Sequence, residues 1–231
     1  MKRFYKTVSV QERPDGFGVA LDGRLMRTPS GAPLVLPTRR VAEVVAAEWA
    51  AQGDEVRPAA MPAMQLASTA IDRVAPLRAA VADELLRFAS TDLLCYRAEN
   101  PAELVRRQTE CWQTIIDWAM LRFDAGLRVT AGVLPVDQPR EALAALRRAV
   151  DGYDAWRLCA LQNLTAATGS LLIALAVIEG RLDGEEAYEF SQLDESYQIA
   201  LWGEDAEAAQ RRAGLRAEIL AAAEFLAAVA G

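Results

Sequence analysis

The run LLIALAVI, residues 171–178, constrains the fold more than any other stretch of the chain. It contains no polar side chain, so a helix formed from it must be buried on every side. The run is too short to cross a bilayer. Together with the residues before it, it predicts one helix over 154–179 at the centre of a bundle. Other helices must then surround it.

The remainder of the C-terminal part supplies those helices. Apolar residues recur at helical spacing between proline and glycine residues, which punctuate the pattern. The expected helices cover 65–74, 76–90, 102–125, 139–151, 184–201 and 205–229. We therefore expect an all-α domain over residues 71–231.

The first forty residues follow a different pattern. FYKTVSVQE, FGVAL, RLMRT and LVL read as four short strands, and Asp15-Gly16 and Asp22-Gly23 are hairpin signals. A helix over 38–53, with Thr38 as N-cap, is expected to cover the sheet. The sequence thus predicts an α+β, two-domain fold: a small β-rich N-terminal domain over residues 1–70 with a covering helix, and a larger all-α C-terminal domain.

Composition excludes several function classes. The formal net charge of −7 argues against nucleic acid and anionic membranes as partners, because phosphate contacts need clustered Lys and Arg. The chain has no histidine, which removes the commonest general base and zinc ligand. Cys95, Cys111 and Cys159 are too widely spaced for a metal knuckle, so we expect no metal and no cofactor.

Four clusters are not explained by periodicity alone: EWAAQ (48–52), STDLLCYR (90–97), QTECWQTIIDW (108–118) and LDESYQIALWGED (193–205). In the first, Trp49 is expected to pack its helix on the sheet. In the second, Asp92 is a candidate cap for a short helix and a partner for Arg97. In the third, Trp112 and Trp118 are six residues apart, so they do not share one narrow helix face.

The fourth cluster lies within the expected helix 184–201. Its apolar stripe is formed by Phe190, Leu193, Tyr197 and Leu201. Asp194 and Gln198 share the neighbouring edge, and Trp202-Gly203 ends the helix. In a continuous helix, Asp194 and Glu195 have no capping role, which makes them candidates for function.

Taken in order along the chain, these clusters resemble the ATP synthase assembly chaperone family that handles the alpha subunit of the catalytic head. The resemblance also includes KRFYK (2–6), LDGR followed by RTP (21–29) and AMPAM (60–64). It extends over nearly the whole chain and points to an α-proteobacterial member.

The resemblance implies a non-enzymatic chaperone that uses no nucleotide. Its implied partner is the free alpha subunit, whose beta-contacting surface it shields until assembly. We expect a bacterial, cytoplasmic protein without membrane insertion that is monomeric when free. In this family the acidic residue that matters falls on Glu195, with Asp194 adjacent, and the tryptophan that matters falls on Trp49. The predicted client-binding residues are Glu195, Asp194, Tyr197, Gln198, Trp202, Trp49 and Asp92.

Two other hypotheses remain open. The first is a carboxylate-based hydrolase or isomerase, with Asp194, Glu195 and Asp92 in a cleft between the two domains; a strongly raised carboxyl pKa would favour it. The second is a generic helical scaffold, favoured by the absence of an exposed apolar or aromatic patch.

Overall fold

The computed structural model describes residues 1–132 and 134–231. The chain forms two compact units. The N-terminal unit comprises residues 1–78, 154–160 and 221–231, and the helical unit comprises 79–153 and 161–220. The predicted division into domains over residues 1–70 and 71–231 stays a prediction. Across the two described stretches, no helix combines the length and the apolar character needed to span a bilayer.

The sheet of the N-terminal unit has three antiparallel strands in the order β1-β2-β3. They are β1 (Val8–Arg13), β2 (Gly16–Leu21) and β3 (Arg24–Leu25). Asp22 and Gly23 both have positive φ, 47° and 79°, as a tight hairpin turn of this kind requires. The hairpin predicted at this Asp-Gly pair is therefore confirmed.

The predicted fourth strand, LVL, is wrong as a strand. Leu36 forms only an isolated bridge with Phe17, in which each amide donates to the other's carbonyl at 3.0 and 2.7 Å. Pro33 and Pro37 flank the segment and cannot donate to a ladder, which limits the pairing. Gly16 permits this close approach, because a Cβ there would lie 2.5 Å from the Leu36 carbonyl oxygen.

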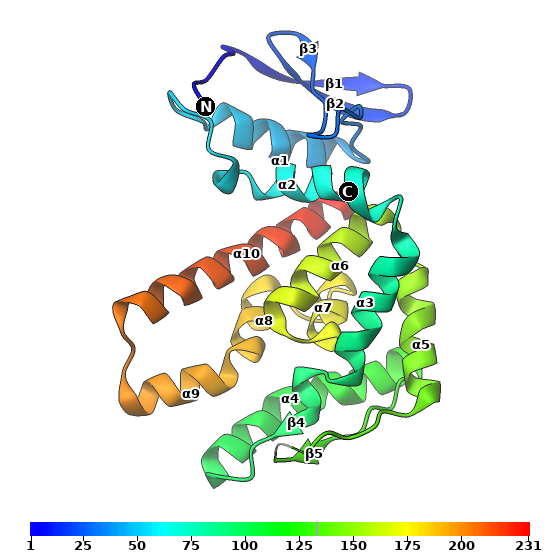
Figure 1. Ribbon diagram of the computed structural model, residues 1–231, viewed down its shortest axis with the longest axis vertical. Helices are drawn as coiled ribbons and strands as arrows, with labels where there is room; N and C mark the ends of the chain where they lie inside the picture. Colours follow the sequence, from blue (N-terminus) through cyan, green and yellow to red (C-terminus); the bar gives the residue numbers. More distant parts are fainter. Residues whose placement is uncertain (133) are drawn as a thin grey trace. The chain divides into compact units, whose positions relative to one another are not determined.

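The predicted covering helix is confirmed as α1 (Arg39–Ala50). Its first turn is capped by Thr38, whose hydroxyl accepts a hydrogen bond from the Val41 amide at 3.1 Å. The helix packs on β1 and β2 (Figure 1). After α1 the chain forms η1 (Pro58–Ala60), α2 (Pro62–Thr69) and a π-helical turn, η2 (Ala70–Val74).

Most of the remaining chain is helical (Figure 1). The elements are α3 (Arg78–Ser90), η3 (Leu93–Cys95), α4 (Ala102–Phe123), α5 (Arg140–Asp151), α6 (Ala155–Thr168), α7 (Leu171–Ile178), α8 (Gly184–Ser191), α9 (Leu193–Trp202) and α10 (Ala206–Ala230). Two short strands, β4 (Tyr96–Arg97) and β5 (Thr130–Ala131), pair in parallel. The α+β architecture predicted from the sequence is confirmed.

The prediction of one central helix over 154–179 is correct about the burial of its second half but wrong about its continuity. Every residue from Leu171 to Val177 is at most 9% exposed. The helix is, however, interrupted by Gly169, at φ 71°. Ser170 then begins α7 as its N-cap, because its hydroxyl accepts a hydrogen bond from the Ile173 amide at 3.0 Å. Gly169 and Ser170 therefore form a break between α6 and α7.

Asp92 is fully buried beside this break. Its carboxylate accepts hydrogen bonds from the Ser170 hydroxyl at 2.7 Å and from the Leu94 and Leu172 amides at 3.1 Å each. Asp92 therefore caps η3, as predicted, and also holds the first turn of α7. Burial raises the pKa of Asp92 to about 6, although the hydrogen bonds oppose that shift.

This pKa makes stability depend on pH. Because the folded-state pKa of about 6 lies above the ordinary 3.8, the folded chain binds this proton more tightly than the unfolded chain. Between about pH 7 and pH 5, protonation of Asp92 should raise the free energy of unfolding by about 1 kcal/mol. Asp92→Asn should lack this increment. Urea unfolding of both proteins at the two pH values measures it, and an equal pH response in both would contradict the assignment.

Candidate functional site

Helix α9 is unusual in having no buried residue. It contacts α4 and α8 within the helical unit. The predicted continuous helix 184–201 is wrong, because the backbone leaves helical geometry at Gln192, between α8 and α9. Asp194 and Glu195 consequently lie in the first turn of α9, where the helix dipole favours acidic side chains. Our expectation that they have no helix-terminal role is corrected by this break.

Asp194 attaches α9 to α4. Its carboxylate accepts a hydrogen bond of 2.7 Å from the side-chain amide of Gln108, which is only 1% exposed. The Gln108 side-chain oxygen accepts in turn from the Ala98 amide at 2.8 Å. Asp194 is therefore a positioning residue for the helix.

Arg97 is part of the same region, and its predicted pairing with Asp92 is wrong. The guanidinium donates instead to the backbone carbonyls of Leu94 and Gln108, at 2.9 and 2.8 Å. It also lies over the ring of Trp112, 5.4 Å from the ring centroid. Burial lowers the pKa of Arg97, and the charge of Asp194 opposes that shift.

Glu195 differs from its neighbour because it has no partner in the described part of the chain. It is exposed and lines a groove of about 320 Å³ with residues of α10 that include Arg211 and Arg212. Arg212 donates to the Ser196 hydroxyl at 2.8 Å and to the Glu204 carboxylate at 3.3 Å. Glu195 is thus a free carboxylate at the edge of a groove that contains cationic side chains.

The C-terminal end of α9 presents apolar surface. Trp202 is 77% exposed and Leu201 is 57% exposed. The next residue, Gly203, ends the helix at φ 83°. An exposed apolar pair beside a polar helix face is typical of a binding surface. We call Glu195, Gln198, Leu201 and Trp202 the α9 surface.

The remaining predicted residue of this helix, Tyr197, is partly exposed. The Arg107 guanidinium of α4 lies 5.4 Å from the centroid of its ring. This cation–π contact fixes the side of α9 that faces α4. Tyr197 therefore orients the helix, together with Asp194.

Trp49 belongs to the N-terminal unit. It is 8% exposed, and its ring meets that of Tyr5 edge to face at 5.5 Å. The Tyr5 hydroxyl donates to the Trp49 carbonyl at 2.6 Å. Trp49 is therefore buried, and its ring contact is with Tyr5 of the segment before β1, so its expected packing on the sheet stays a prediction.

The other polar residues of EWAAQ have roles that our sequence reasoning missed. The Glu48 carboxylate accepts from the Ala63 and Met64 amides, at 2.7 and 2.8 Å, and so caps α2. Gln52 accepts from the Arg57 amide at 2.7 Å. The sequence signal was Pro62, which begins α2 without a capping side chain of its own. Through these hydrogen bonds, Glu48 and Gln52 hold residues 57–64 against the C-terminal end of α1.

The enzymatic hypothesis required a carboxylate with raised pKa that a substrate can reach. Asp92 has the raised pKa but is fully buried, and its oxygens are hydrogen-bonded to the protein. Asp194 is bonded to Gln108 and Glu195 is exposed, so the three carboxylates occupy different environments. In the two described stretches, no group of three His, Cys, Asp or Glu residues is arranged to hold a metal.

Comparisons with known proteins place the chain in a family. The family described as ATP12 chaperone protein matches residues 2–120, just over half of the chain. The chain belongs to the ATP12 chaperone family. This is the family of ATP synthase assembly chaperones that the ordered motifs indicated.

Individual relatives agree with the family assignment. The mitochondrial protein atp12 of Schizosaccharomyces pombe is 26% identical over 87% of this chain and 74% of its own length. The crystal structure of Atp12 from Paracoccus denitrificans is 41% identical, with a TM-score of 0.93 over 99% of this chain and 98% of that one. A mutant of the same protein matches equally well, over 97% of its length.

A third structure, of a chaperone candidate from Agrobacterium tumefaciens, is 44% identical to this ATP12 family member. Its TM-score is 0.93, over 98% of this chain and 85% of that one. The similarity therefore includes both units and all the elements described above.

The capping role of Glu48 leads to a stability prediction. Glu48→Ala removes both acceptors from the N-terminus of α2 and should lower the free energy of unfolding by about 1–2 kcal/mol. Glu43→Ala is the matched control, because Glu43 is exposed on the same helix and should change stability by less than about 0.5 kcal/mol. Urea unfolding measures both variants, and equal effects would contradict the capping role.

Proposed function

We propose that this ATP12 family member binds the free alpha subunit of the ATP synthase catalytic head and shields its beta-contacting surface until assembly. The observation that supports this most is the α9 surface. It combines a carboxylate that has no described partner, Glu195, with a tryptophan that is 77% exposed, Trp202.

The chemistry of the α9 surface suits a protein partner. An exposed tryptophan and leucine contribute binding energy when they leave water, and tryptophan is enriched among residues that dominate interfaces. A free carboxylate beside them selects a partner with a complementary cation and sets the register of the contact.

Apart from Trp49, which packs on Tyr5 in the N-terminal unit, the predicted client-binding residues divide into three groups. Glu195, Gln198 and Trp202 are exposed and are proposed to contact the client. Asp194 and Tyr197 hold α9 against α4 and are proposed to position the first group. Asp92 is fully buried, and we propose that it acts through the fold.

We also propose that the protein binds its client without catalysing a reaction and without a nucleotide. The full burial of Asp92 supports the first of these proposals, because a substrate cannot reach its carboxylate. The bacterial relatives support a cytoplasmic location in a bacterium. We propose a monomer when the client is absent.

Charge reversal at Glu195 tests the proposal. Glu195→Lys should weaken binding of purified alpha subunit about tenfold, because the client's cation then meets a like charge. Glu141→Lys is the matched control, since Glu141 is exposed in the first turn of α5 and loses the same helix-dipole interaction. Titration calorimetry measures affinity, and urea unfolding should show equal, small losses of about 0.3–1 kcal/mol in both variants.

Two results would contradict the proposal. The first is failure of the unsubstituted chain to bind the alpha subunit or to delay its aggregation, measured by light scattering. The second is equal weakening of binding by Glu195→Lys and Glu141→Lys.

Truncation of Trp202 gives an independent prediction. Because Trp202 is exposed, Trp202→Ala should change the free energy of unfolding by less than about 0.5 kcal/mol. Binding of the alpha subunit by this variant should be weaker by about 2 kcal/mol, which is typical of truncating a tryptophan at the centre of an interface. The control is Leu121→Ala, which truncates an apolar side chain that is 87% exposed on α4. If the two truncations weaken calorimetric binding equally, Trp202 is not the anchor.

A further inference from the structure

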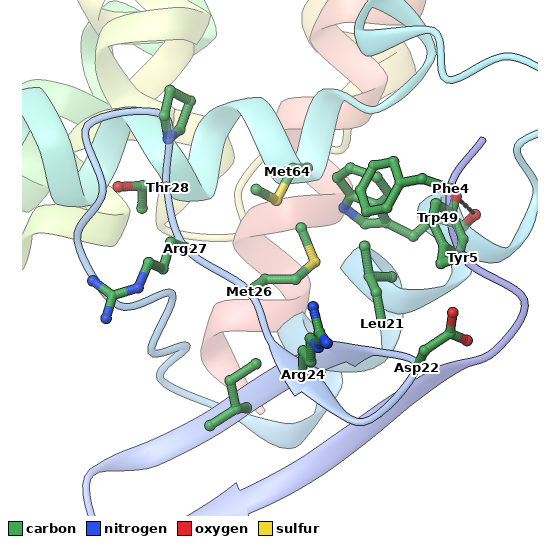
Figure 2. A pocket seen from close by; sticks show the side chains of 12 residues that line it. Phe4, Tyr5, Leu21, Asp22, Arg24, Met26, Arg27, Thr28, Trp49 and Met64 are labelled. Carbon is green, nitrogen blue, oxygen red and sulfur yellow. Dashed lines mark hydrogen bonds between the residues drawn. The ribbon is translucent and has the colours of Figure 1, made fainter. Parts of the chain in front are cut away.

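The N-terminal unit contains a second surface, separate from α9, that the proposed function does not use. It is a pocket of about 720 Å³, within the size range of ligand-binding pockets (Figure 2). Its wall is mainly apolar, formed by Phe4, Leu21, Leu25, Met26, Trp49 and Met64. The side chains come from the N-terminal segment, the β2–β3 hairpin and its continuation, α1 and α2 (Figure 2).

Trp49, one of the residues that line this pocket, carries an unsatisfied donor. The indole nitrogen of Trp49 is buried and donates to no acceptor in the described part of the chain. Figure 2 shows that nitrogen turned toward Met64, whose thioether is no more than a weak acceptor. A buried N–H without a partner is costly, so a shift of the side chains beside it that lets a carbonyl oxygen of a bound molecule reach it would be favoured.

The free charge at the rim of the pocket is positive. Arg24 is exposed, and its guanidinium forms no hydrogen bond or ion pair within the described residues. The acid beside it, Asp22, is already engaged, because its carboxylate accepts from the Lys6 and Thr7 amides at 3.0 and 2.8 Å. Those hydrogen bonds lower the pKa of Asp22. On a chain with net charge −7, this rim favours an acidic group on the bound molecule.

The pocket opens onto an apolar lip. Phe4 is 62% exposed and Leu25 is 41% exposed, and both line the pocket. Apolar surface that continues from a pocket onto the outside of a protein suits a polypeptide, which can fill the pocket with one side chain and lie along the lip.

We propose that this pocket binds one extended segment of the client through a large apolar side chain. The segment's backbone carbonyl accepts the Trp49 indole N–H, and a neighbouring Asp or Glu pairs with Arg24. The identity of the client rests on the proposed function, and this contact is additional to the α9 surface.

Photo-cross-linking tests where the client lies. The full chain carries p-benzoylphenylalanine in place of Phe4 or, as control, in place of Leu77, which is 52% exposed in the same unit and does not line the pocket. Irradiation with purified alpha subunit should give a cross-link from position 4 and little from position 77. Mass spectrometry should map the product to a segment in which an apolar residue is next to Asp or Glu.

Charge reversal tests the rim. Arg24→Glu should weaken calorimetric binding of the alpha subunit about tenfold. The control, Arg57→Glu, reverses an exposed arginine outside the pocket and should leave affinity unchanged. Both variants should keep the unfolding midpoint of the unsubstituted chain, because neither arginine side chain has a described partner to lose.

The outcomes separate this inference from the proposed function. If the unsubstituted chain does not bind the alpha subunit, both are overturned. If it binds, but Arg24→Glu has no effect or position 4 cross-links no better than position 77, the pocket inference alone is overturned. Cross-links from position 4 between two copies of the chain, formed without alpha subunit, would identify a second copy as the occupant. A small molecule retained in the pocket, detected by native mass spectrometry, would likewise replace the client segment.

Discussion

The helical unit depends on one buried carboxylate. Asp92 is removed from water at a cost that raises its pKa to about 6, and three hydrogen bonds partly offset that cost. Those bonds join the connection between α3 and α4 to the first turn of α7. Because α7 is buried on every side, its position determines where α4 and α8 pack. Removal of this carboxylate would leave two buried donors, the Ser170 hydroxyl proton and the Leu172 amide, without their acceptor.

Sequence patterns predicted the elements better than their interruptions. The apolar run 171–178 correctly indicated a helix buried all round, and Thr38 correctly indicated the start of α1. The break at Gly169 was missed because its capping partner, Asp92, is 78 residues from Ser170. The LVL strand was over-predicted because hydrophobicity outweighed the two flanking prolines in our reading. Local propensity is visible in a sequence, whereas a long-range cap is visible only in the fold.

The candidate site shows the same division. The sequence pointed to Glu195 for lack of a capping role, yet the break at Gln192 places it in a first turn, where a carboxylate has an ordinary electrostatic reason to be. Glu195 remains a candidate for client binding because it is exposed, lines the groove beside α10 and has no partner among the described residues. For Glu48 the error is the opposite one. We assigned no specific role to it from the sequence, whereas in the structure its carboxylate caps the N-terminus of α2.

The lack of buried residues in α9 also affects its dynamics. A helix of this length in water gains little from its own backbone bonds, and tertiary packing supplies most helical stability. Three side-chain contacts hold α9: hydrogen bonds from Gln108 and Arg212 and a cation–π contact with Arg107. With no buried residue of its own, α9 should open at a lower free energy than α7. A partner that binds α9 therefore uses part of the binding free energy to order the helix. Such a surface releases its partner more readily than a rigid one of equal area, which suits a protein that must give up its client.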